Sequence, residues 1–68
     1  MDIKVFYDRE NKEKTLELDG NTSVKDLLKK MNINPITVIV SRNDNIILED
    51  EELKDKDDIK IISVISGG

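Results

Sequence analysis

The chain has 68 residues, of which 37% are hydrophobic, so it can form one small domain that buries about 60% of the surface its unfolded form would expose. It contains no cysteine and no histidine, which excludes disulfides, thiolate or imidazole metal sites, and catalytic triads built on either side chain. Eleven basic and fifteen acidic residues give a net charge of −4, which argues against general nucleic-acid binding and favours a partner with a basic docking face.

The N-terminal segment carries charge from its second residue and shows no apolar stretch of the kind that directs secretion. Elsewhere in the sequence, no apolar run approaches the ~20 residues that a membrane-spanning helix needs. We therefore expect a cytoplasmic protein that does not associate with membranes.

Two segments near the N-terminus alternate between apolar and polar residues. The alternating apolar positions are Ile3, Val5 and Tyr7 in the first segment, and Leu16 and Leu18 in the second. A period of two is typical of a strand with one buried face. The polar residues 8–14 lie between the two segments, so the pattern predicts a β-hairpin.

The next segment changes to a helical period. Its apolar residues, at positions i, i+3, i+4 and i+7, are Val24, Leu27, Leu28 and Met31. Lysines occupy the opposite side, so the pattern predicts an amphipathic helix with one apolar stripe. Ser23 is a suitable N-cap residue, and Asp26, three residues later, completes a capping-box arrangement.

Two further strands are predicted after the helix. Asn34–Pro35 favours an extended or turn conformation, and residues 36–40 follow with β-branched apolar side chains on one face, beginning with Ile36. After a polar turn, the apolar residues 46–48 predict a short fourth strand.

The remainder of the chain contains acidic segments and a last strand. Residues 49–52 are all acidic, and Asp55, Asp57 and Asp58 follow in a polar turn. They lack the ligand spacing and central glycine of a calcium-binding loop, so we expect solvated loops and no metal site. Residues 59–65 include five β-branched residues and predict the final strand.

The order of the predicted elements indicates an α+β domain, with one helix packed across a mixed sheet of four or five strands. A helix this short depends on the sheet for its stability. This order predicts a β-grasp fold, in which the first and last strands lie side by side in the middle of the sheet. Residues 1–65 would form the domain, and residues 66–68 would form a flexible C-terminal tail.

A second set of apolar residues should face away from the helix. Its members are Phe6, Ile39, Ile62 and Val64. They belong to three strands that are neighbours in a β-grasp sheet, and apolar residues clustered on an exposed face often mark a contact surface. We expect a partner protein, or another copy of the chain, to bind there, although isolated apolar residues on a solvated sheet face are also common.

The end of the chain carries a motif that is specific to a family. The stretch DDIKIISVISGG, preceded by LKD and by the helix sequence TSVKDLLKKM, resembles the ThiS family, the small sulfur-carrier proteins of thiamine biosynthesis. It is similar, more loosely, to the small subunit of molybdopterin synthase and to ubiquitin-like modifiers. The resemblance extends over essentially the whole chain, and the last dozen residues are its most specific part.

The resemblance implies a carrier and not an enzyme. The carboxylate of Gly68 would be adenylated by an E1-like activating enzyme and then thiocarboxylated, with Ser66 and Gly67 as the lead-in. The chain would bind no cofactor, because the activating enzyme would use the ATP and magnesium. A sulfur donor and a sulfur-acceptor enzyme would be the other partners, and the free protein would be a monomer that binds no nucleic acid.

A physical argument supports a role for the terminal glycines. A carboxylate that must reach the α-phosphate of ATP inside another protein has to pass along a narrow channel, and a Cβ atom would widen that channel or restrict φ. At average glycine usage, two glycines would end a chain by chance in about 0.5% of cases.

Three positions depart from the family pattern. The turn VSRNDN stands where a shorter Asn-Gly turn is common, and Lys56 stands where glycine is frequent. Ser63–Val64 replaces a frequent proline. The sulfur could be destined for thiamine, molybdopterin or thiolated tRNA. Two other functions stay open: a ubiquitin-like modifier joined to lysines, which begins with the same acyl-adenylate, and a protein-binding β-grasp module with an inert tail.

Overall fold

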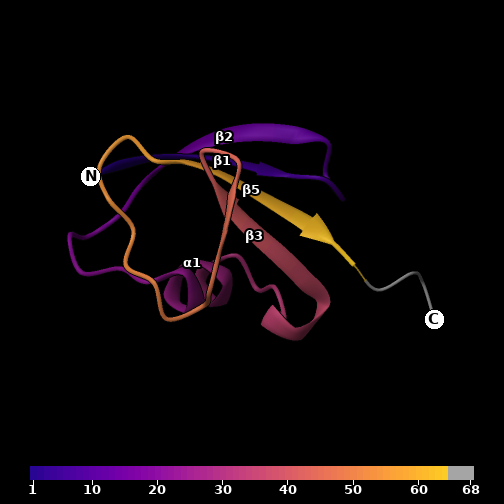
Figure 1. Ribbon diagram of the computed structural model, residues 1–68. Coiled ribbons are helices and arrows are strands. Elements are labelled where there is room, and N and C mark those ends of the chain that lie inside the picture. The colour runs from indigo at the N-terminus through magenta and orange to yellow at the C-terminus, as the bar shows by residue number, and fades with distance from the viewer. Residues whose placement is uncertain (65–68) are drawn as a thin grey trace.

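The computed structural model describes residues 1–64, and it shows one α-helix across one face of a five-stranded mixed sheet (Figure 1). The strands are β1 (Asp2–Tyr7), β2 (Lys12–Glu17), β3 (Val38–Arg42), β4 (Asn45–Ile47) and β5 (Asp58–Ser63), and the helices are α1 (Val24–Lys30) and the short 3₁₀ helix η1 (Pro35–Thr37). The strand order is β2-β1-β5-β3-β4, with β1 and β5 parallel and the other pairs antiparallel. The predicted β-grasp fold is confirmed, including the central position of the first and last strands.

One face of the sheet and the apolar stripe of α1 form the core. Its buried apolar residues are Ile3, Val5, Leu18, Val24, Leu27, Leu28, Ile33, Val40, Leu53, Ile59 and Ile61. Three residues of the predicted stripe are therefore fully buried, while Met31 and Val38 are half-buried and pack against the edge of the core. Burial of this kind contributes roughly 1.5–3 kcal/mol for each large aliphatic side chain, so α1 is held mainly by the sheet.

Local hydrogen bonds begin and end α1. Ser23 Oγ accepts from the N–H of Asp26 at 3.2 Å, and Asp26 Oδ2 accepts from the N–H of Ser23 at 3.3 Å, so the predicted capping box is confirmed. At the other end, Asn32 has a positive φ of 63°, and the N–H of Ile33 donates to the carbonyl of Leu28 at 2.8 Å. This pattern is a Schellman motif, and it turns Ile33 into the core.

The third strand begins later than predicted. Asn34 Oδ1 accepts from the N–H of Ile36 at 3.1 Å and caps the 3₁₀ helix, which starts with Pro35. Ile36 is therefore 79% exposed, and the prediction that it belongs to the third strand, on one face with Val38 and Val40, is wrong. β3 continues to Arg42 instead of ending at Val40.

Other strand boundaries also differ from the predictions. β2 starts at Lys12 instead of Thr15, because it is an edge strand whose charged side chains reach water without penalty. β4 ends at Ile47, one residue early. β5 is assigned as far as Ser63, and the predicted end of the strand and of the domain at Ile65 lies outside the described residues.

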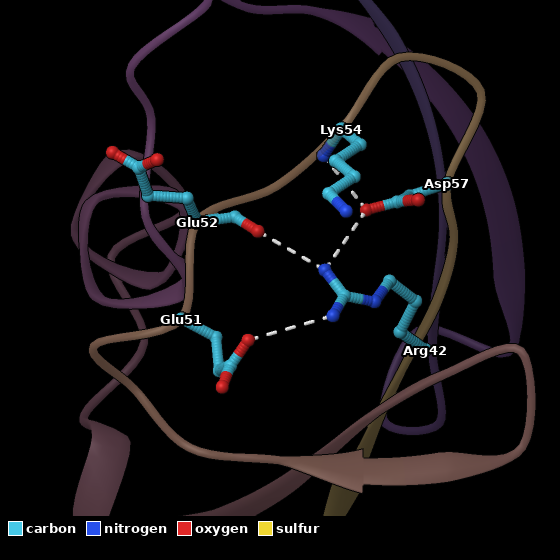
Figure 2. Close-up of polar contacts among 5 residues, drawn as sticks. All are labelled: Arg42, Glu51, Glu52, Lys54 and Asp57. Atoms are coloured by element: carbon cyan, nitrogen blue, oxygen red, sulfur yellow. Dashed lines mark hydrogen bonds and ion pairs between the residues drawn. The ribbon is translucent and has the colours of Figure 1, made fainter.

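The loop between β4 and β5 is anchored to the sheet by Arg42 of β3 (Figure 2). Arg42 Nη1 donates to the carbonyl of Glu52 at 3.0 Å and to Asp57 Oδ2 at 3.4 Å. The same oxygen of Asp57 accepts from the N–H of Lys54 at 2.8 Å, and Asp57 is only 7% exposed. The prediction that Asp57 lies in a solvated loop is therefore wrong, whereas the acidic residues 49–52 are exposed as predicted.

This loop also supplies acceptors to the start of α1. The carbonyl of Glu51 accepts from the N–H of Val24 at 2.9 Å, and the carbonyl of Glu49 accepts from the N–H of Lys25 at 2.8 Å. The first N–H groups of a helix have no partner within the helix. The loop satisfies them from outside, so it is joined to the helix as well as to the sheet.

Candidate functional site

The sheet face opposite α1 carries the predicted apolar residues. Ile39 and Ile62 lie directly opposite each other on β3 and β5, and they are 41% and 39% exposed. Phe6 is half-buried on β1 and pairs with Lys60, which places it diagonal to Ile62 on the same face. Val64, just past the end of β5, is also exposed. The structure thus brings these side chains onto neighbouring strands of the exposed face.

One apolar residue that was not predicted extends this surface, and a second is exposed at the nearby edge of the sheet. Ile46 and Leu48 are 72% and 69% exposed. Ile46 pairs with Ser41 of β3, so it lies on the same face as Ile39. Leu48 follows β4 and lines, together with Val24 and Leu28 of α1, a hollow of about 530 Å³ at this edge of the sheet. A period of two in residues 45–47 is the only local signal for Ile46, and so short a segment leaves its face ambiguous.

We call this surface the open-face patch, which comprises Phe6, Ile39, Ile46, Ile62 and Val64. Charged residues of both signs surround it. Lys4 pairs with Asp58 across β1 and β5, and Lys60 Nζ lies 3.5 Å from Asp44 Oδ1. An apolar centre with a mixed charged rim is typical of protein-docking surfaces. The net charge of −4 therefore does not predict the charge around this face, where residues of both signs occur.

β5 ends beside the open-face patch. The strand lies between β1 and β3, and just beyond it the N–H of Val64 donates to the carbonyl of Thr37 at 3.0 Å. Gly68 follows Val64 by four residues, a chain length of at most about 14 Å. The predicted tail residues Ser66, Gly67 and Gly68 lie outside the described residues.

The part of the chain that the structure describes contains neither a grouped metal site nor a membrane-spanning helix. Across residues 1–64, no three acidic side chains are grouped so that they could hold a metal ion. The helices of the same residues include none that is long and apolar enough to cross a bilayer.

The sequence matches the ThiS family over residues 4–68. It is also similar to the sulfur carrier protein TtuB from Thermus thermophilus, with 31% identity over 55 residues. That alignment covers 81% of this chain and 85% of TtuB.

Solved structures share the fold. SAMP1 from Haloferax volcanii has a TM-score of 0.75 and 16% identity, over 100% of both chains. A ubiquitin-like protein from Caldiarchaeum subterraneum has a TM-score of 0.67 and 18% identity, over 98% of this chain and 100% of its own. At these identities the likeness shows the ubiquitin-like β-grasp fold alone.

Proposed function

The chain belongs to the ThiS family of sulfur-carrier proteins, and on that premise we propose that Gly68 is the residue that carries the sulfur. Its C-terminal carboxylate is adenylated by an E1-like activating enzyme and is then converted to a thiocarboxylate. The protein is a carrier and not an enzyme. The activating enzyme holds the ATP and the magnesium, and a sulfur donor and a sulfur-acceptor enzyme complete the set of partners.

The chemistry has two steps. A carboxylate oxygen of Gly68 attacks the α-phosphorus of ATP, the bond to the β-phosphate breaks, and pyrophosphate leaves. Hydrosulfide from the sulfur donor then attacks the carbonyl carbon of the acyl-adenylate, and AMP leaves with the bridging oxygen and the electron pair. One carboxylate oxygen has been exchanged for sulfur, and no oxidant or reductant is consumed. Activation is needed because an unmodified carboxylate has no good leaving group.

The central position of β5 is the observation that best supports this proposal. β1 pairs with β5 as far as Ile61 and β3 pairs with it as far as Ser63, so the strand is held in place beside the open-face patch. A partner that docks on the patch therefore meets the end of β5 at a defined place, five residues before Gly68. Preorganisation of this kind reduces the entropy that must be lost before the carboxylate can react.

We infer that the activating enzyme docks on the open-face patch. Ile39 and Ile62 lie at its centre, and Phe6 and Val64 extend it along β1 and past the end of β5. These side chains are partly exposed in the free protein, so covering them removes apolar surface from water. The free protein would be a monomer in the cytoplasm, where ATP is supplied.

For the acceptor of the sulfur, we propose a class of enzyme. It is an enzyme that inserts sulfur into a cofactor or a nucleoside, with thiamine, molybdopterin and thiolated tRNA as the candidate products. In each case the thiocarboxylate supplies a nucleophilic sulfur on a protein that the acceptor enzyme can recognise.

Intact mass spectrometry tests the proposal. The full chain is incubated with an activating enzyme from the same organism, MgATP and sulfide. We expect a mass increase that corresponds to the exchange of one oxygen for sulfur, which requires ATP and is lost when Gly68 is deleted. If the native and Gly68-deleted chains give the same masses, the tail is inert and the protein is a binding module. If the chain purified from its own cells is joined to lysines of other proteins, it is a modifier.

A further inference from the structure

On the β1 side, the end of β5 is held by a side chain, because the pairing of β1 with β5 ends at Ile61 while β3 still pairs with Ser63. Along the parallel pair, the last backbone bond runs from the N–H of Asp8 to the carbonyl of Ile61 at 3.1 Å. The same register would next pair the N–H of Ser63 with the carbonyl of Asp8. No such bond forms: the chain turns toward β2 at this point, and the carbonyl of Asp8 accepts from the N–H of Asn11 at 3.1 Å within that turn.

The carboxylate of Asp8 takes the place of the missing acceptor. Asp8 Oδ2 accepts from the N–H of Ser63 at 3.0 Å, and Asp8 Oδ1 accepts from the Ser63 hydroxyl at 3.1 Å. Arg9 Nε donates to Ser63 Oγ at 3.3 Å. Both bonds to the carboxylate are partly buried and charge-assisted, so they are stronger than a neutral pair. We call this arrangement the Asp8–Ser63 clamp.

We propose that Asp8 is a positioning residue for the activation of Gly68, an inference that rests on the proposed function. The Asp8–Ser63 clamp and the bond from Val64 to Thr37 secure the chain on two sides at the point where it leaves the sheet. The segment that follows Val64 therefore begins at a fixed position in the fold. Without the clamp the end of β5 keeps its pairing with β3 but has no partner on the β1 side beyond Ile61. The carboxylate of Gly68 then samples a larger volume and reaches the α-phosphate less often.

A kinetic signature separates positioning from stability, because the carrier is the substrate of the activating enzyme. Partial unfolding lowers the concentration of competent carrier, so it raises the apparent KM and leaves kcat unchanged at saturation. Both carboxylate oxygens of Asp8 bond to Ser63 and the group is partly buried, so we expect docking on the open-face patch to be retained when Asp8 is replaced. A loss of positioning after docking therefore lowers kcat and leaves KM unchanged.

The experiment measures pyrophosphate release at increasing carrier concentration, with full-length variants and an activating enzyme. We expect Asp8→Ala to lower kcat about tenfold and to change KM less than about twofold. Asp8→Asn removes the same charge, but its oxygen can accept from the Ser63 N–H and its amide can donate to Ser63 Oγ. Asp8→Asn should therefore restore most of kcat. Asp19→Ala removes an exposed carboxylate from the loop between β2 and α1, away from the open-face patch, and should leave both constants unchanged.

Amide hydrogen exchange of the free protein provides a second measurement that does not need the enzyme. In Asp8→Ala the N–H groups of Ser63 and Val64 should exchange faster, while those of β3 should not change. An unchanged kcat, an increase in KM alone, or unchanged exchange at Ser63 would each overturn the proposal. If the native chain is not adenylated at all, the proposed function fails and the positioning role fails with it, while the exchange result still decides whether the clamp holds β5.

Discussion

Lys56 has a left-handed backbone conformation, with φ of 67°, in the turn before β5. A side chain costs roughly 1–2 kcal/mol there relative to glycine, and this cost is partly offset because glycine has more freedom in the unfolded chain. The N–H of Lys56 donates to the carbonyl of Asp2 at 2.7 Å, a bond that glycine would keep. We expect Lys56→Gly to raise the free energy of unfolding by about 0.5 kcal/mol in urea denaturation.

Lys54→Gly is the matched control, because Lys54 lies in the same loop without a positive φ. It should lower the stability by roughly 0.5–1 kcal/mol through the greater entropy of the unfolded chain. If both variants lost stability equally, the backbone conformation of Lys56 would not be a source of strain.

Gly67 is expected to affect activation and not stability. Gly67→Ala adds one methyl group outside the described part of the domain, so we expect the free energy of unfolding to change by less than about 0.5 kcal/mol. In the channel of the activating enzyme, the methyl group restricts φ or widens the chain, so the rate of adenylation of Gly68 should fall steeply. Unfolding curves and pyrophosphate release measure the two effects. An unchanged adenylation rate would argue against a narrow channel.

At the scale of the elements, β3 and β5 present the centre of the open-face patch. Ile62 is partly exposed in the free domain and should be buried only when a partner docks. We expect Ile62→Asp to raise the KM of the carrier for the activating enzyme at least about tenfold, because a charge would enter an apolar contact. The free energy of unfolding should fall by no more than about 1 kcal/mol.

Ile36→Asp is the control for this prediction, because Ile36 is exposed on η1 and does not belong to the patch. It should leave KM unchanged. If Ile62→Asp unfolded the domain, the face would be covered within the monomer and could not be a docking surface. If both substitutions raised KM equally, the effect would come from charge alone.

At the scale of the whole molecule, the loop between β4 and β5 joins sheet and helix through Arg42. Two carboxylates contact this guanidinium, Asp57 at 3.4 Å inside the fold and Glu51 at 3.5 Å at the surface. We expect Asp57→Ala to lower the free energy of unfolding by roughly 1–3 kcal/mol, because the N–H of Lys54 and the guanidinium lose a buried acceptor. Glu51→Ala should cost less than about 0.5 kcal/mol, since exposed ion pairs are weak. Equal effects in urea denaturation would show that burial is not the deciding factor.

Several features of this molecule could be predicted because they depend on residues close together in the chain. The helix stripe and the capping box of Ser23 and Asp26 span eight residues or fewer, and the alternation in β1 and β5 follows a period of two. The predicted start of β3 was wrong for a local reason. Asn34–Pro35 can precede a strand or begin a 3₁₀ helix, and here Asn34 Oδ1 accepts from the Ile36 N–H, which stabilises the helix.

The sequence by itself determined the kinds of element, their order and the apolar faces, because hydrophobic period, capping and turn chemistry act over a few residues. Tertiary structure alone decided the environment of particular carboxylates. Asp57 is buried because the topology places Arg42, 15 residues away, beside it, and Asp8 secures the end of β5 across a separation of 55 residues. Ile46 joins the open-face patch for the same reason, since pairing with β3 and not its own short segment selects its face. Such contacts depend on which strands become neighbours, and no local pattern of residue types specifies that choice.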